Sequence, residues 1–171
     1  MSAYAKDEVA VWQSGTAFEI TADSGRSTLT DGDAKLAMSP MELLLAALVG
    51  CTGADVIEIL RKKRQAVSRL EIRVHGERSD KHPRVYTAID LQFIVTGQAI
   101  DSEAVRRAIE LSEVKYCSVS AMLRSTAKFK IGFEIRENEP RAASGGVLPE
   151  PGSNGNVETY RDVDSEIGDI Q

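Results

Sequence analysis

Alternating apolar and polar residues predict strands in the first third of the chain. Apolar side chains recur at every second position over 9–11 and 18–20, and a further short strand is expected over 27–30, after a turn signal. A period of two is typical of a half-buried strand. Gly15 and Gly25 lie in polar clusters between these runs and mark turns. The pattern therefore predicts a meander of three strands.

A long apolar run over 43–60 predicts the central helix. It follows the sequence Ser-Pro-Met-Glu at 39–42, in which serine caps the helix, proline suits its first position, and Glu42 completes a capping box. The run is apolar on nearly every side, so we expect the helix to be buried on most of them. Gly50 and Gly53 lie within it, and small residues there predict a second helix packed closely against it.

The rest of the body continues with two strands, two helical segments and one more strand. Alternation over 70–75 and 85–95 predicts a hairpin closed by a polar connector. A helix is expected over 101–116 and a short helical turn over 118–125. Alternation over 127–135 predicts the final strand.

The charge of the chain is concentrated at its carboxyl end. The 171 residues carry a formal net charge of −5. Residues 1–135 contain 18 acidic and 18 basic side chains, whereas 136–171 contain 8 acidic and 3 basic ones. We therefore expect one folded domain, 1–135, followed by an acidic Gly/Pro-rich tail, 136–171, that is mobile. A neutral body argues against a nucleic acid partner, and the basic run at 61–64 suits a helix end.

Composition also bears on location and cofactors. No uninterrupted run of about 18 apolar residues is present, so no membrane span is expected, and the charged start over 1–11 does not resemble a secretory signal. We expect a cytoplasmic protein. The chain has two cysteines and two histidines, His75 and His82, which are too few and too scattered to predict a metal site. No cofactor is expected.

Cys51 and Cys117 are the candidates for chemistry, and two interpretations stay open. Free cysteines are often buried structural residues. Alternatively, the two form a redox pair in which one thiol becomes a sulfenic acid and condenses with the other. Cys117 precedes a short helix, and a helix start favours the thiolate. Asp55 lies one turn after Cys51, and a carboxylate there is expected to oppose activation of that thiol unless a cation neutralises it.

Glu42 has a structural and a functional interpretation. The structural one is the capping box. The functional one is limited by geometry, because Glu42 lies nine residues before Cys51. At about 100° per residue, nine steps place the two side chains on opposite faces of one helix. Glu42 can therefore assist Cys51 only across a dimer interface.

Three segments carry a resemblance to a known family. They are Ser-Pro-Met-Glu-Leu-Leu at 39–44, Gly-Cys at 50–51, and Tyr-Cys-Ser-Val-Ser at 116–120 with Met-Leu at 122–123. Together they resemble the OsmC/Ohr family, and the stretch 115–120 is most similar to its YhfA-like branch. The resemblance extends from Val9 to Ile135 and leaves out the tail.

The resemblance implies an α+β fold and an intertwined homodimer. In that fold two Cys-bearing helices pack antiparallel at the centre, wrapped by antiparallel sheets. The well-studied branches are thiol peroxidases that reduce organic hydroperoxides, and Ohr proteins take electrons from dihydrolipoamide-type dithiols. By this resemblance Cys51 is the peroxidatic cysteine, Cys117 the resolving cysteine, and Glu42 a contributor from the partner chain.

Two departures from the family pattern keep a second function open. By the resemblance, the active branches carry an arginine upstream of the peroxidatic cysteine at a spacing that falls near Asp31 here; Lys35 and Arg26 are the nearest cations. Ser118 stands where those branches have proline. The alternative is a non-catalytic dimer that binds a small apolar or thiol-reactive molecule.

Overall fold

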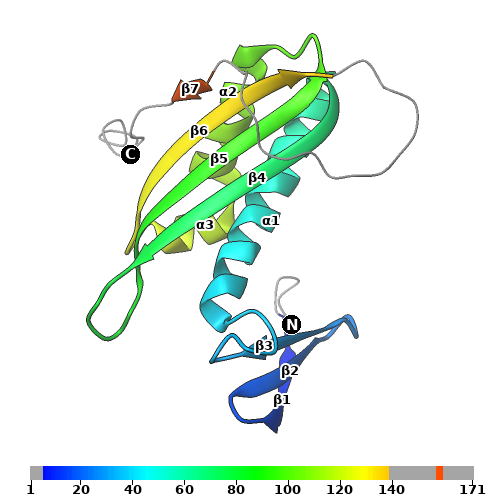
Figure 1. Ribbon diagram of the computed structural model, residues 1–171. Helices are drawn as coiled ribbons and strands as arrows, with labels where there is room; N and C mark the ends of the chain where they lie inside the picture. The colour runs from blue at the N-terminus through cyan, green and yellow to red at the C-terminus, as the bar shows by residue number, and fades with distance from the viewer. Residues whose placement is uncertain (1–5, 139–156, 160–171) are drawn as a thin grey trace. The chain divides into compact units, whose positions relative to one another are not determined.

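The computed structural model describes residues 6–138 and 157–159, and it has an α+β fold with two sheets (Figure 1). The chain forms two compact units, 1–47 and 48–171. The elements in chain order are β1 (Glu8–Ser14), β2 (Ala17–Ala22), β3 (Ser27–Asp31), α1 (Pro40–Lys62), β4 (Ala66–Arg78), β5 (Tyr86–Gln98), α2 (Ser102–Leu111), a π-helix (Ser112–Tyr116), α3 (Ser118–Leu123), β6 (Lys128–Glu137) and β7 (Val157–Thr159).

The first unit contains the predicted meander, which is confirmed. β1, β2 and β3 form an antiparallel sheet in that order. The β1–β2 turn contains Gly15, whose φ of +53° lies in the left-handed region that glycine adopts at little cost. The turn is closed further by Trp12, whose Nε1 donates to the Gly15 carbonyl oxygen at 3.1 Å.

The predicted capping box at the start of α1 is confirmed. The Glu42 carboxylate accepts from the backbone nitrogen and the hydroxyl of Ser39, both at 2.7 Å. The Glu42 backbone nitrogen donates to Ser39 Oγ at 3.3 Å. These bonds satisfy donors that the first helical turn leaves without partners, which is why α1 begins at Pro40.

The expectation that α1 is buried on most sides is not met within the chain. The fully buried side chains form one stripe at four-residue spacing: Leu48, Thr52, Val56 and Leu60. The second helix expected at the glycines stays a prediction, and within this chain Gly53 faces β4. A Cβ at this position would lie 3.0 Å from Cδ1 of Ile72, a β4 side chain. A Cβ on Gly50 would meet nothing within 4 Å among the described residues.

The composition of α1 bears on the expectation that the chain has no membrane span. Within the described part of the chain it is the one helix long and apolar enough, by length and composition, to cross a membrane. A few charged residues interrupt the run, which is why a search for an unbroken apolar stretch misses it. The core helix of a soluble protein passes the same test. With its stripe of wholly buried residues, α1 is such a core helix.

The second unit is built on a four-stranded sheet in the order β4-β5-β6-β7. β4 and β5 form the predicted antiparallel hairpin. β5 and β6 are parallel, which corrects the expectation of purely antiparallel sheets. The reason is the connection, because α2 and α3 lie between these strands and return the chain to the same end of the sheet. Crossing helices of this kind are what parallel pairing requires.

The core of this unit lies between one face of the sheet and the helices (Figure 1). Alternate residues of β5 and β6 are buried toward it, whereas Asp90, Lys128 and Lys130 on the other face are exposed. The buried set is Ile89, Leu91, Phe93, Val95, Phe129, Ile131 and Phe133 from the strands and Leu48, Val56, Leu60, Val105, Ala108 and Ile109 from the helices. Burying an aliphatic or aromatic side chain of this size contributes about 1.5–3 kcal/mol.

The acidic tail contributes a short strand to the sheet. β6 extends to Glu137, two residues beyond the boundary expected at 135. β7 then pairs antiparallel with β6, with Gly132 opposite Thr159. This pairing is not predictable from composition. Most of the tail that was expected to be mobile, 139–156 and 160–171, lies outside the residues that the structure describes.

Candidate functional site

The two cysteines lie side by side in the second unit. Cys51 is on α1, and Cys117 is the residue that caps α3. Their Sγ atoms and a carboxylate oxygen of Asp55 all lie within 4.8 Å of one another. Both thiols are free. The crossover from β5 through α2 to α3 brings together two thiols that are 66 residues apart in sequence.

The two thiols differ in exposure. Cys51 is half-buried, whereas Cys117 is 3% exposed. Burial raises the pKa of the Cys117 thiol, and the neighbouring Cys51 raises it further, although hydrogen bonds from Ser120 act in the opposite direction. One of those bonds runs from the Ser120 backbone nitrogen to Cys117 Sγ at 3.4 Å.

The sequence correctly predicts that Cys117 stands at a helix start, but the thiolate character expected there is wrong. Loss of hydration outweighs the side-chain and backbone hydrogen bonds from Ser120, so the pKa of the Cys117 thiol is raised. Of the two sulfurs, Cys51 is the one that solvent and solutes can reach.

Asp55 is held in place by a hydroxyl from the π-helix. Ser112 Oγ donates to Asp55 Oδ2 at 3.0 Å. Ser112 is itself fully buried and lies 2.9 Å from the hydroxyl of Thr52 on α1. The Asp55 carboxylate therefore has a defined orientation beside the thiols.

Glu113 is the centre of a buried polar network next to the cysteines. It is 4% exposed, and its Oε1 accepts from Thr52 Oγ1 at 3.0 Å and from Ser120 Oγ at 3.1 Å. Its Oε2 accepts from Arg124 Nη2 at 3.1 Å. The Arg124 guanidinium also lies over the Phe129 ring, 4.5 Å from its centroid. One carboxylate thus joins α1, the π-helix, α3 and β6.

This network bonds the Cys117 thiol and includes the neighbour of Cys51, and sequence reasoning missed it. Thr52 follows Cys51 directly, and Ser120 bonds Cys117 Sγ through its backbone and Glu113 through its side chain. The one sequence feature that could have indicated this network is the pair of polar residues at 112–113, which interrupts the apolar pattern near the end of the predicted helix. That signal is weak, because polar residues at a helix end are usually solvated.

Glu42 is placed by the structure in the capping box. Its bonds with Ser39 hold the pKa of the Glu42 carboxyl below its usual range, the backbone donor contributing most. Glu42 is exposed to solvent. The carboxylate therefore has an assured structural role at the start of α1.

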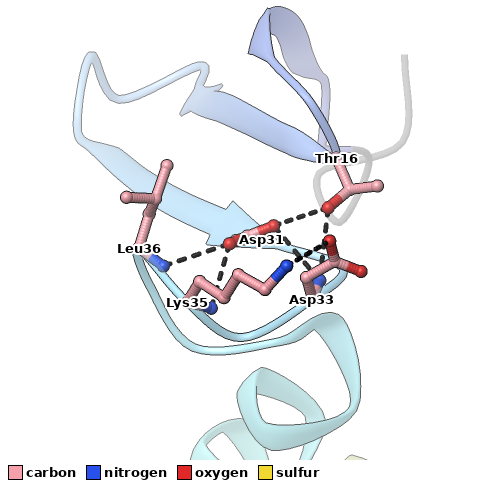
Figure 2. A network of polar contacts seen from close by, with 5 residues as sticks. All are labelled: Thr16, Asp31, Asp33, Lys35 and Leu36. Atoms are coloured by element: carbon pink, nitrogen blue, oxygen red, sulfur yellow. Dashed lines mark hydrogen bonds and ion pairs between the residues drawn. The ribbon is translucent and has the colours of Figure 1, made fainter.

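Asp31, near which the arginine of the family pattern was expected, has a structural role (Figure 2). The residue is 3% exposed. Its carboxylate accepts from Thr16 Oγ1 at 2.6 Å and from the backbone nitrogens of Asp33, Lys35 and Leu36 at 3.0–3.1 Å. These donors, led by the Thr16 hydroxyl, hold the pKa of Asp31 far below its usual range. Asp31 thereby organises the connection from β3 to α1.

The two cations considered as substitutes for the arginine lie on the surface. Lys35 Nζ forms an ion pair with Asp33 at 3.3 Å, and both side chains are largely exposed. Arg26 is exposed in the turn before β3, where its carbonyl oxygen accepts from the Ala22 nitrogen. Neither contact points to a role in thiol chemistry.

Comparisons with known proteins agree on one family. Residues 31–132 match the family model described as OsmC-like protein. The chain is 42% identical to Protein YhfA of Escherichia coli K12 over 125 residues, which are 72% of this chain and 93% of the relative.

Two solved structures are similar in fold. A hypothetical protein from Aquifex aeolicus has a TM-score of 0.73 and 32% identity, covering 79% of this chain and 98% of its own. The organic hydroperoxide resistance protein OhrB of Bacillus subtilis has a TM-score of 0.53 and 16% identity, covering 77% and 99%.

Proposed function

The chain belongs to the OsmC-like protein family, and we propose that it is a thiol peroxidase that reduces organic hydroperoxides. The observation that supports this most is the pairing of a reachable thiol, Cys51, with a buried one, Cys117, at close range. OhrB, which shares the fold, is named for organic hydroperoxide resistance.

In the proposed reaction Cys51 is the peroxidatic residue. Its thiolate attacks the distal oxygen of the hydroperoxide, the O–O bond breaks, and an alcohol leaves after taking up a proton. Cys51 becomes a sulfenic acid. The apolar residues of α1 around it favour hydrophobic peroxides over hydrogen peroxide.

Cys117 is the proposed resolving residue. Its sulfur attacks the Cys51 sulfenic acid, a disulfide forms, and water leaves. The sulfurs are already close enough for small side-chain rotations to bring them to bonding distance. An external dithiol of the dihydrolipoamide type then reduces the disulfide by thiol–disulfide exchange and is itself oxidised.

We place Glu42 in the same reaction as a contribution from a partner chain. The helical spacing directs Glu42 and Cys51 to opposite faces of one helix, so this role requires a homodimer. The apolar surface that α1 leaves uncovered supports such a dimer.

The test is the non-reduced intact mass after one equivalent of cumene hydroperoxide. We expect the wild type to lose two hydrogens as the disulfide forms. Cys117→Ser should stop at a sulfenic acid that dimedone traps, and Cys51→Ser should consume no peroxide. The proposal is wrong if both thiols remain free in the wild type, or if Cys51→Ser retains full peroxide turnover.

A second candidate function is a non-catalytic dimer that binds a small apolar or thiol-reactive molecule. Two observations favour it: Asp31, near which the family arginine was expected, is engaged by Thr16 and by the loop that follows Asp31, and Cys117 has a raised pKa. A pure binder should react with iodoacetamide no faster than free cysteine does. A Cys51 thiol that titrates well below about 8.5 contradicts this alternative.

A further inference from the structure

Cys51, Asp55 and Cys117 are three potential metal ligands that converge on one point. Within 6–138 and 157–159 they are the group of three such residues whose donor atoms all lie within 4.8 Å of one another. We propose that, in the reduced protein, they bind one Zn²⁺ ion. This proposal does not rest on the peroxidase function, since it requires only the three side chains.

The donor set suits zinc. Zn²⁺ in proteins is held by thiolate sulfur, imidazole nitrogen and carboxylate oxygen in a tetrahedron. Zn–S bonds of about 2.3 Å in that geometry place two sulfurs roughly 3.8 Å apart. The donor atoms here lie within 4.8 Å of one another, so modest side-chain rotations complete the geometry. Three protein ligands leave the fourth position for a water molecule or another small ligand.

Two of the ligands stand on one rigid element. Cys51 and Asp55 are four residues apart on α1, so they project from the same face. The same spacing places two ligands on one helix in known zinc sites. Cys117 approaches from the start of α3 and supplies the third donor from a separate segment.

Two of the three ligands, Asp55 and Cys117, are each oriented by a hydrogen bond from a neighbouring serine. Ser112 Oγ donates to Asp55 Oδ2 at 3.0 Å, and the Ser120 nitrogen donates to Cys117 Sγ at 3.4 Å. Bonds of this kind fix ligand orientation, and losing one typically weakens metal affinity 10–100-fold. Ser112 and Ser120 are fully buried, so these supports are not exchanged for solvent. The sequence alone does not predict this site because Asp55 is not recognisable as a ligand there.

Zinc binding and disulfide formation exclude each other at this site. Both use the same two sulfurs, and zinc requires them as thiolates. Bound zinc therefore shields the thiols from oxidation, whereas a Cys51–Cys117 disulfide leaves Asp55 alone and abolishes binding. The site would report the redox state of the pair as presence or loss of the ion.

The test is a ZnCl₂ titration of the full, reduced chain against a chromophoric chelator. We expect one zinc per chain, and no binding after the disulfide has been formed by oxidation. Asp55→Asn preserves the shape of the side chain and a hydrogen-bond acceptor for Ser112, and it should weaken zinc binding at least tenfold. Glu58→Gln, an exposed acid on the same helix paired with Lys62, is the matched control and should bind as the wild type does.

A second measurement keeps the proposal testable if a variant folds poorly. Co²⁺ bound by thiolates absorbs in the near ultraviolet through sulfur-to-metal charge transfer, and we expect this band in the wild type and its loss in Cys51→Ser and Cys117→Ser. The proposal is overturned by no zinc uptake, by one zinc per two chains, or by equal affinity in Asp55→Asn and wild type. Peroxide turnover is a separate readout, so its failure leaves the zinc result interpretable.

Discussion

At the residue scale, two buried carboxylates show how much a side chain's role depends on its donors. Asp31 and Glu113 are both nearly inaccessible to solvent. Asp31 is satisfied by the Thr16 hydroxyl from the β1–β2 turn and by three backbone nitrogens of its own loop. Glu113 is satisfied by two hydroxyls and a guanidinium from other elements. The first orders a connection, and the second ties together the segments that carry both thiols.

Asp31 predicts a specific dependence of stability on pH. Its pKa is lower in the folded chain than the unfolded value of about 3.9. Its stabilising contribution is therefore complete above about pH 4 to 5 and is lost as the pH falls below the unfolded value. Asp31→Asn should unfold more easily than wild type at pH 7, in urea titrations. The difference between the two should shrink toward pH 2; a constant difference contradicts the assignment.

Glu113 predicts a large loss of stability on truncation. Glu113→Ala removes the carboxylate that faces Arg124, whose side chain is 18% exposed, and should lower the free energy of unfolding by roughly 3 kcal/mol or more. Glu113→Gln keeps an acceptor and should cost less. Glu110→Ala, which removes an exposed ion pair with Arg107 on the same helical stretch, should change stability by less than about 1 kcal/mol. Equal effects in urea unfolding at positions 110 and 113 would contradict the network.

At the scale of the element, helix ends show where local geometry overrides residue preference. α1 ends at Lys62 and is closed by a left-handed residue, Arg64, with φ of 57°. The Arg64 nitrogen donates to the Arg61 carbonyl at 2.9 Å, and the Gln65 nitrogen donates to the Leu60 carbonyl at 3.0 Å. This closing pattern usually carries glycine, because a Cβ is unfavourable there. The positive charges of the basic run thus suit the helix dipole, whereas the side chain of Arg64 disfavours the left-handed backbone conformation at that position.

Replacing that residue with glycine should stabilise the protein. Arg64→Gly relieves the left-handed conformation and should raise the free energy of unfolding by roughly 0.5–1 kcal/mol. Lys63→Gly, one position earlier, keeps its helical bond to Ile59 and should lower stability by up to about 1 kcal/mol, because glycine is a poor helix former. Thermal unfolding should show a higher unfolding temperature for Arg64→Gly and a lower one for Lys63→Gly. A lower unfolding temperature for both variants contradicts the prediction.

At the scale of the whole molecule, apolar surface is left uncovered. β1 is exposed along its full length, and Trp12 is 63% exposed, as is Val9. A small three-stranded sheet needs a packed face to be stable. Together with the uncovered sides of α1, this surface agrees with the homodimer proposed above.

Trp12 makes the dimer measurable, because it is the only tryptophan in the chain. In a dimer that covers β1, its fluorescence emission should be shifted to shorter wavelength and protected from acrylamide. Light scattering should then give twice the mass of the chain, and the unfolding temperature should rise with protein concentration. A monomer by light scattering, with Trp12 quenched as readily as free tryptophan, contradicts the dimer.

Because periodicity and capping are local, the sequence by itself determined the elements of residues 1–135 and their order, but not β7. The meander, the hairpin, the capping box at Glu42, and the positions of Cys51 and Cys117 on or beside helices follow from neighbouring residues alone. The family resemblance rests on the same local segments, and the comparisons confirm it.

Only the tertiary structure decided the strand directions and the surroundings of the thiols. The parallel pairing of β5 with β6 depends on where the crossover helices return the chain. The contacts of Asp55 with Ser112 and of Glu113 with Arg124 join positions that are 57 and 11 residues apart. No local pattern encodes such a contact, because whether a polar side chain is solvated or buried beside a partner depends on how the elements pack. That packing also buries Cys117, and burial rather than the helix start has the largest effect on the pKa of its thiol.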